Sequence, residues 1–111
     1  MSEIKELEQE IEQAEDLVSR RNMALKLFEN REFRKLIMEE FLTSEAARLV
    51  QLSADPSLTH DQRADALAMA QATGHVKRYL SMTVQMGAVA EREMADMKAS
   101  LDELRGIEMD A

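Results

Sequence analysis

The sequence predicts an all-α protein: an elongated helical hairpin or bundle with long N- and C-terminal coiled-coil helices and two short central helices. The 111 residues include only three Gly and one Pro, and the commonest residue types are those that lose least on entering a helix. Near both ends, apolar residues recur in alternating steps of three and four, the heptad spacing of helices that pack lengthwise. We expect one domain, residues 1–111.

The first predicted helix, residues 1–29, is acidic. Its apolar series is interrupted only at Arg21 and consists of Ile4, Leu7, Ile11, Ala14, Val18, Leu25 and Phe28. Asn30 suits the end of this helix and the start of the next, because its side chain can accept a hydrogen bond from a free backbone N–H. From this helix we expect contacts to other helices through Ile4, Leu7, Ile11, Val18 and Leu25.

Residues 30–58 predict two short amphipathic helices followed by a loop. The first runs to about Leu42, and Thr43 and Ser44 then offer a cap for the second, which continues to about Leu52. The pair Asp55-Pro56 ends that second helix, because proline disfavours helical backbone in the residue before it.

The last predicted helix covers residues 59–106. Thr59 and Gln62 have the spacing of a capping box, in which each side chain satisfies the other residue's backbone N–H. Gly74 costs about 1 kcal/mol inside a helix and marks a position for a kink or break, and Gly106 is the expected end. Heptad steps fill the C-terminal half, where the expected contact residues are Ala90, Met94, Met97, Leu101 and Leu104.

The charges beside the first heptad series disfavour a parallel homodimer, which would oppose like charges: these flanking residues are Glu3, Glu8, Glu10 and Glu15. Antiparallel contact with the last helix is better, because Lys98 and Arg105 flank its series, and an external basic groove would be better still. The small and flexible residues of the C-terminal series specify a partner weakly. They close against another subunit, form a promiscuous binding face or fill an irregular core.

The net charge of −8 is unevenly distributed: residues 1–19 carry −6, residues 20–48 carry +2 and residues 49–111 carry −4. Arg31, Arg34 and Lys35 form a candidate basic patch. An acidic chain is a poor ligand for duplex nucleic acid, and the aromatic residues are too few to stack on single-stranded bases. We therefore expect these bases to pair with acids of this chain or of another subunit.

No catalytic, cofactor-binding or metal-binding residues emerge. His60 and His75 lack further ligands at matched spacing, and no glycine-rich phosphate loop or nucleophile elbow occurs. We expect no enzyme activity, no cofactor, no metal and no small-molecule substrate. Cysteine is absent, which permits a reducing compartment. Neither a signal peptide nor an apolar run of the roughly 20 residues that cross a membrane is apparent.

Three consecutive stretches carry a resemblance to known proteins: Glu32–Leu42, Glu45–Leu52 and Ala54–Leu58. In this order, after an amphipathic N-terminal helix, they resemble a family of small helical proteins encoded among the head and structural genes of tailed bacteriophages. The likeness covers a quarter to half of the chain and implies a virion-associated or assembly-related role. It carries over no site residues, and the long methionine-rich C-terminal helix departs from it.

Three functional hypotheses follow. The first is a non-enzymatic phage virion-associated or assembly protein that contacts itself or a larger capsid or portal component through its helices. The second is a small acidic phage regulator that binds and modulates a host protein through its N-terminal helix, and the third is a weak nucleic-acid-binding accessory protein. The expected location is the host cytoplasm during infection and the virion.

Overall fold

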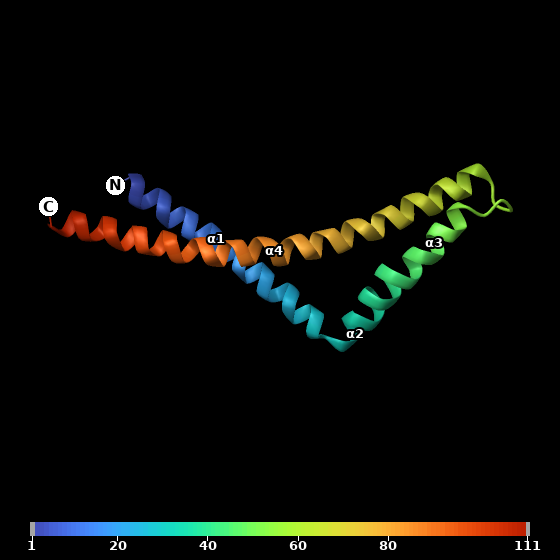
Figure 1. The fold of residues 1–111 in the computed structure, drawn as a ribbon, viewed down its shortest axis with the longest axis horizontal. Helices are drawn as coiled ribbons and strands as arrows, with labels where there is room; N and C mark the ends of the chain where they lie inside the picture. The colour runs from blue at the N-terminus through green and yellow to red at the C-terminus, as the bar shows by residue number, and fades with distance from the viewer. Residues whose placement is uncertain (1, 111) are drawn as a thin grey trace. The chain divides into compact units, whose positions relative to one another are not determined.

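The predicted all-α class is confirmed by a computed structural model that describes residues 2–110 (Figure 1). No strand occurs among these residues. The elements in chain order are α1 (Ser2–Glu29), α2 (Arg31–Phe33), η1 (Arg34–Glu45), α3 (Ala46–Ser53) and α4 (His60–Asp110).

The contacts divide the chain into two compact units, where the sequence predicted a single domain. Unit 1 combines α1 up to Ala24 with α4 from Met82 onward, and unit 2 is the intervening segment Leu25–Ser81. Both α1 and α4 therefore contribute to each unit.

Unit 1 is an antiparallel pair of helices, with the start of α1 and the end of α4 at the same end (Figure 1). The ion pairs show the direction: Glu8 of α1 pairs with Arg105 of α4, whereas Arg21, further along α1, pairs with the earlier residue Glu91. The sequence left open whether the two heptad series close within one chain or between chains. In unit 1 they close within one chain.

Unit 2 contains the end of α1 and the turn that follows it, which Asn30 organises as predicted. The Asn30 Oδ1 accepts a hydrogen bond from the backbone N–H of Phe33 at 2.8 Å, and the rings of Phe28 and Phe33 lie 6.3 Å apart across the turn. Further along the unit, Leu49 of α3 and Ala66 of α4 are buried.

The break predicted at Thr43 and Ser44 is wrong, because helical backbone continues without interruption from Arg31 to Ser53. The central section, η1, is a π-helix, a form that is rare beyond a single turn. Both hydroxyls bond back along their own helix: Thr43 donates to the Met38 carbonyl at 2.9 Å and Ser44 to the Glu39 carbonyl at 3.2 Å. They are therefore engaged within one helix and do not cap a second.

The loop before α4 follows the sequence signals closely. The Asp55 carboxylate accepts hydrogen bonds from the Ser57 backbone N–H at 2.9 Å and the Ser57 hydroxyl at 2.8 Å. The capping box is confirmed, because the Thr59 N–H donates to Gln62 Oε1 at 3.0 Å and the Gln62 N–H donates to Thr59 Oγ1 at 3.1 Å. Helix α4 then begins at His60, as expected.

Neither Gly74 nor Gly106 interrupts α4, although the sequence suggested a kink at the first and the helix end at the second. The helix continues through Gly74 and passes the expected end at Gly106 to reach Asp110. A glycine that ends a helix usually adopts a positive φ, and no glycine in residues 2–110 does so. Gly106 is therefore an interior helical residue.

The capping box gives a direct test of how α4 begins. Replacing Thr59 with Ala removes the acceptor for the Gln62 N–H and should lower the free energy of unfolding by about 1 kcal/mol, measured by urea denaturation followed by circular dichroism. Thr43→Ala is the matched control, because that hydroxyl bonds within a continuous helix and its loss should leave the stability unchanged or higher. Equal losses in both variants would contradict the capping role.

Candidate functional site: the paired helices of unit 1

The heptad residues predicted to make contacts lie along the seam of unit 1, with one exception. Ile11, Ala90 and Leu101 are buried, and the half-buried members are Ile4, Leu7, Val18, Met94, Met97 and Leu104. Leu25 falls in unit 2, where its side chain is 42% exposed. The α4 residues pack against α1 of the same chain, which fits their interpretation as core filling.

Arg21, the apparent interruption in the first heptad series, lies in the seam itself. Its side chain is only 14% exposed, and Ala24, one turn later, is buried. After Val18 the seam therefore follows Arg21 and Ala24, whereas the sequence pattern continued to Leu25. The charged side chain occupies a place that a small or apolar residue would usually fill.

Gly87 of α4 makes room for Arg21. A Cβ atom added at Gly87 would overlap Arg21 Cβ and would lie 2.9 Å from both Arg21 Cγ and the backbone carbonyl oxygen of Leu17. The two backbones approach so closely here that no larger residue fits without movement. From the sequence, Gly87 was one of several small residues that specify a partner weakly, but in unit 1 it fixes the crossing point of α1 and α4.

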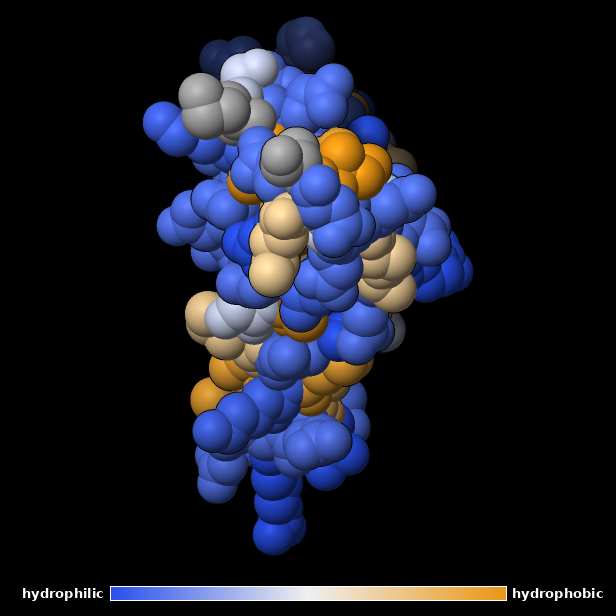
Figure 2. Space-filling model, turned by 90° about the vertical axis from the view of Figure 1, so that its left-hand side faces the viewer, coloured by the Kyte–Doolittle hydropathy of each residue, from blue (hydrophilic) through white to orange (hydrophobic). Residues whose placement is uncertain are grey.

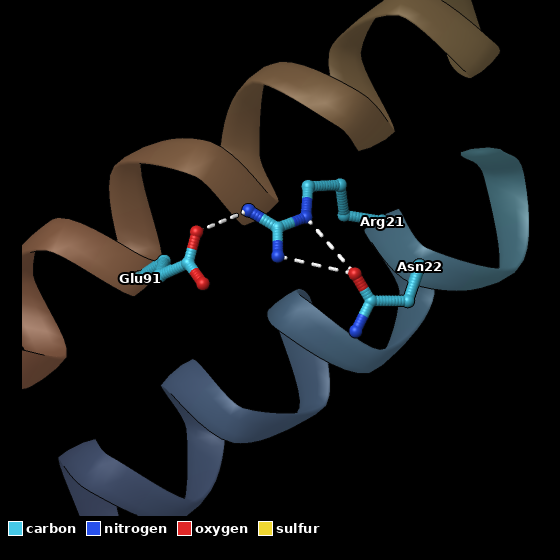
Figure 3. A network of polar contacts seen from close by, with 3 residues as sticks. All are labelled: Arg21, Asn22 and Glu91. Atoms are coloured by element: carbon cyan, nitrogen blue, oxygen red, sulfur yellow. Dashed lines mark hydrogen bonds and ion pairs between the residues drawn. The ribbon is translucent and has the colours of Figure 1, made fainter.

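The guanidinium group of Arg21 is held from both sides (Figure 3). Its Nη1 donates to Glu91 Oε2 of α4 at 2.6 Å, while Nε and Nη2 donate to Asn22 Oδ1 at 3.2 and 3.1 Å. This fork uses the planar geometry of arginine, which lysine cannot reproduce. The hydrogen bond from Arg21, together with its positive charge, lowers the pKa of the Glu91 carboxyl below its ordinary value of 4.5.

A second ion pair joins the helices nearer their ends. Arg105 Nη2 lies 3.0 Å from Glu8 Oε1, and both side chains are about half exposed. Exposed pairs of this kind contribute little to stability, but this one uses charges that flank the seam, as the antiparallel arrangement predicted. The two ion pairs therefore help to set direction and register.

One exposed apolar stripe of α4 lies beside the seam. Met82, Met86 and Val89 have the i, i+4, i+7 spacing of a single helix face, and they are 42%, 47% and 40% exposed. Beside them an open groove is lined by Leu17, Gln85, Met86, Ala88, Val89, Ala90, Arg92 and Glu93. Sequence reasoning missed this stripe because it followed only the heptad series, although the spacing itself was visible.

The end-on view in Figure 2 shows hydrophilic side chains over most of the visible surface, with apolar patches between them.

The net charge is not evenly divided between the two units. In unit 1, residues 2–24 and residues 82–110 each carry seven acidic and three basic residues, so the unit holds a net charge of −8. Unit 2, with eight of each, is neutral. The acidic character of the whole chain therefore resides in unit 1.

The candidate basic patch lies in the neutral unit. Arg31, Arg34 and Lys35 are all exposed, and Lys35 Nζ lies 3.9 Å from Glu39 and 3.6 Å from Glu40. The predicted pairing with local acids is thus present for Lys35. A patch whose charge is balanced within its own unit has little net attraction for phosphate groups.

Nowhere in residues 2–110 do three or more His, Cys, Asp or Glu side chains gather as they would around a metal ion. None of the helices there combines the length and the apolar character needed to span a bilayer.

No protein-family model, curated protein or solved structure matches this chain.

The crossing point can be tested by giving Gly87 a side chain. Gly87→Ala should destabilise the protein, because overlap with Arg21 and the Leu17 backbone costs about 1–3 kcal/mol and outweighs the roughly 1 kcal/mol gained in helix propensity. Gly74→Ala is the matched control: a Cβ there meets nothing within 4 Å, so it should stabilise by up to about 1 kcal/mol. Urea denaturation measures both, and stabilisation by Gly87→Ala would refute the close approach.

The Arg21–Glu91 pair should give unit 1 a pH dependence. Because the pKa of Glu91 is lowered in the folded protein, the pair stabilises the fold above the ordinary carboxyl pKa, and this contribution is lost as the pH falls through the lowered value. Glu91→Gln should therefore be less stable than the parent at pH 7, and the difference should shrink as the pH falls below 4.5. Chemical denaturation across this pH range measures it.

Glu93→Gln is the control for that experiment. Glu93 lies two residues further along α4 and makes no ion pair with any residue in 2–110, so its stability difference should not show the same pH dependence. If the two variants behaved alike, the effect would come from net charge and not from the Arg21 contact.

Proposed function

We propose that this protein is a non-enzymatic interaction protein that acts through helix–helix contacts, and that its setting is the assembly or the virion of a tailed bacteriophage. The observation that carries the proposal is the exposed apolar stripe of α4 at Met82, Met86 and Val89, next to a seam already filled by α1. An apolar stripe left over after a helix has paired suits contact with a further helix.

Two features support the proposal, one for the non-enzymatic role and one for the phage setting. The pockets of unit 1 are open grooves along the helices, whereas small-molecule sites bury most of their ligand; one such groove is lined by Gln9, Glu12, Gln13, Asp16 and Leu17. The resemblance of residues 32–58 to phage head-gene proteins supplies the biological context. The partner would be another copy of the chain or a larger capsid or portal component.

A second candidate function rests on the charge distribution. With a net charge of −8 confined to unit 1, this unit could engage a basic surface of a host protein, as expected for a small acidic regulator. Assembly remains our first proposal because it also uses the resemblance.

Native mass spectrometry of the full chain, combined with fractionation of infected cells, tests the assembly function. We expect a species heavier than the 12.6 kDa of one chain, or stoichiometric recovery with phage particles or their precursors. A monomer that binds no particle component would overturn the proposal. A stoichiometric complex with a host protein, together with absence from particles, would establish the regulator in its place.

A further inference from the structure

We propose that the groove between Leu17 and the Met86–Val89 face docks an amphipathic helix of another protein, whose apolar stripe is flanked by lysine or arginine. This inference rests on the proposed helix-mediated function and names the chemistry of its partner. It draws on the apolar lining of the groove, the acidic residues around it and the net charge of unit 1.

The lining supplies the apolar contact. Met86 and Val89 are 47% and 40% exposed, and together with Ala88, Ala90 and the half-buried Leu17 they make up the apolar strip in the lining of the groove. Such a strip accepts the i, i+3, i+4, i+7 side chains of an incoming helix. Methionine adapts its shape readily, so the strip can accept more than one sequence.

The rims supply the preference for positive charge. On the α1 side Leu17 also borders Glu12 and Asp16, and on the α4 side the groove ends at Arg92 and Glu93. An adjoining groove adds Glu10. Asp16 lies 3.1 Å from Arg20, but both side chains are more than half exposed, so this pair can exchange partners at little cost. The groove itself is thus lined by one base and one acid, and the two grooves that share Leu17 with it add three more acids, Glu10, Glu12 and Asp16. This excess of acids beside the groove favours a basic helix.

The same charges argue against a second copy of unit 1 as the occupant. Two such units would bring net charges of −8 and −8 together, and juxtaposed like charges oppose association. A helix that carries several lysines has the opposite effect, and salt should weaken its binding. Charge complementarity thus selects a different, basic chain.

A designed probe tests this directly: a fluorescent amphipathic peptide with leucine at the heptad a and d positions and lysine at the flanking e and g positions. Fluorescence anisotropy with the full chain should show saturable binding that weakens with salt. A peptide with the same leucines and with glutamate in place of lysine should bind at least about tenfold more weakly.

Met86→Glu separates docking from general attraction between charges. This variant makes unit 1 more negative, so adsorption of the basic peptide would be kept or strengthened, whereas docking in the groove should weaken at least about tenfold because the apolar strip is interrupted. Met69→Glu is the matched control, since it adds the same charge at an exposed methionine of unit 2 and should leave binding nearly unchanged. Val89→Gln alters the groove without adding charge and serves if Met86→Glu loses its helical circular dichroism.

Three results would overturn the inference: no saturable binding of the basic peptide, equal or tighter binding by Met86→Glu, or self-association of the parent protein that Met86→Glu abolishes. The last would make a second copy the occupant. Assembly with particle components that persists in Met86→Glu would leave the proposed function intact while removing this groove from it, so the two failures can be told apart.

Discussion

The close approach of α1 and α4 at Gly87 is the constraint on which unit 1 depends. Because Gly87 has no side chain, the stem of Arg21 lies directly over the α4 backbone, and its guanidinium reaches Glu91 while Asn22 holds the other edge. A cation thus occupies the seam with its polar end satisfied, as burial of a charged group requires. The crossing point then sets where the remaining heptad residues of the two helices meet.

Two helices that cross this closely bury little apolar surface between them. The buried residues of unit 1 include Ala14, Ala24, Gly87 and Ala90, with Ile11 and Leu101 as the larger members. Small residues permit close packing but remove little apolar surface from water. Two helices can also cover only one face each, so the stripe at Met86 and Val89 stays exposed. An exposed apolar stripe on a unit with so few large buried residues is consistent with the proposed helix–helix contact.

The sequence predicted features that depend on local signals or on repeated spacing. Neighbouring residues alone predict the all-α class, the Asn30 turn and the capping box of Thr59 and Gln62. The heptad spacing of the apolar residues predicts the seam. The predictions that were wrong depended either on contacts between residues far apart in the chain or on the tendency of a long helix to continue past a local stop signal. Arg21 broke the pattern because the space that admits it is created by Gly87, sixty-six positions away, and Gly106 and Ser44 carry signals that their helices override.

Charge supplies the discrimination that the apolar residues of unit 1 lack. Methionine accepts many partner shapes, so the exposed stripe of Met82, Met86 and Val89 would by itself bind without much selectivity. The net charge of −8 on the same unit would oppose contact with an acidic partner at this face and would speed encounter with a basic one. Unit 2, with equal numbers of acidic and basic residues, adds no net charge to that of unit 1.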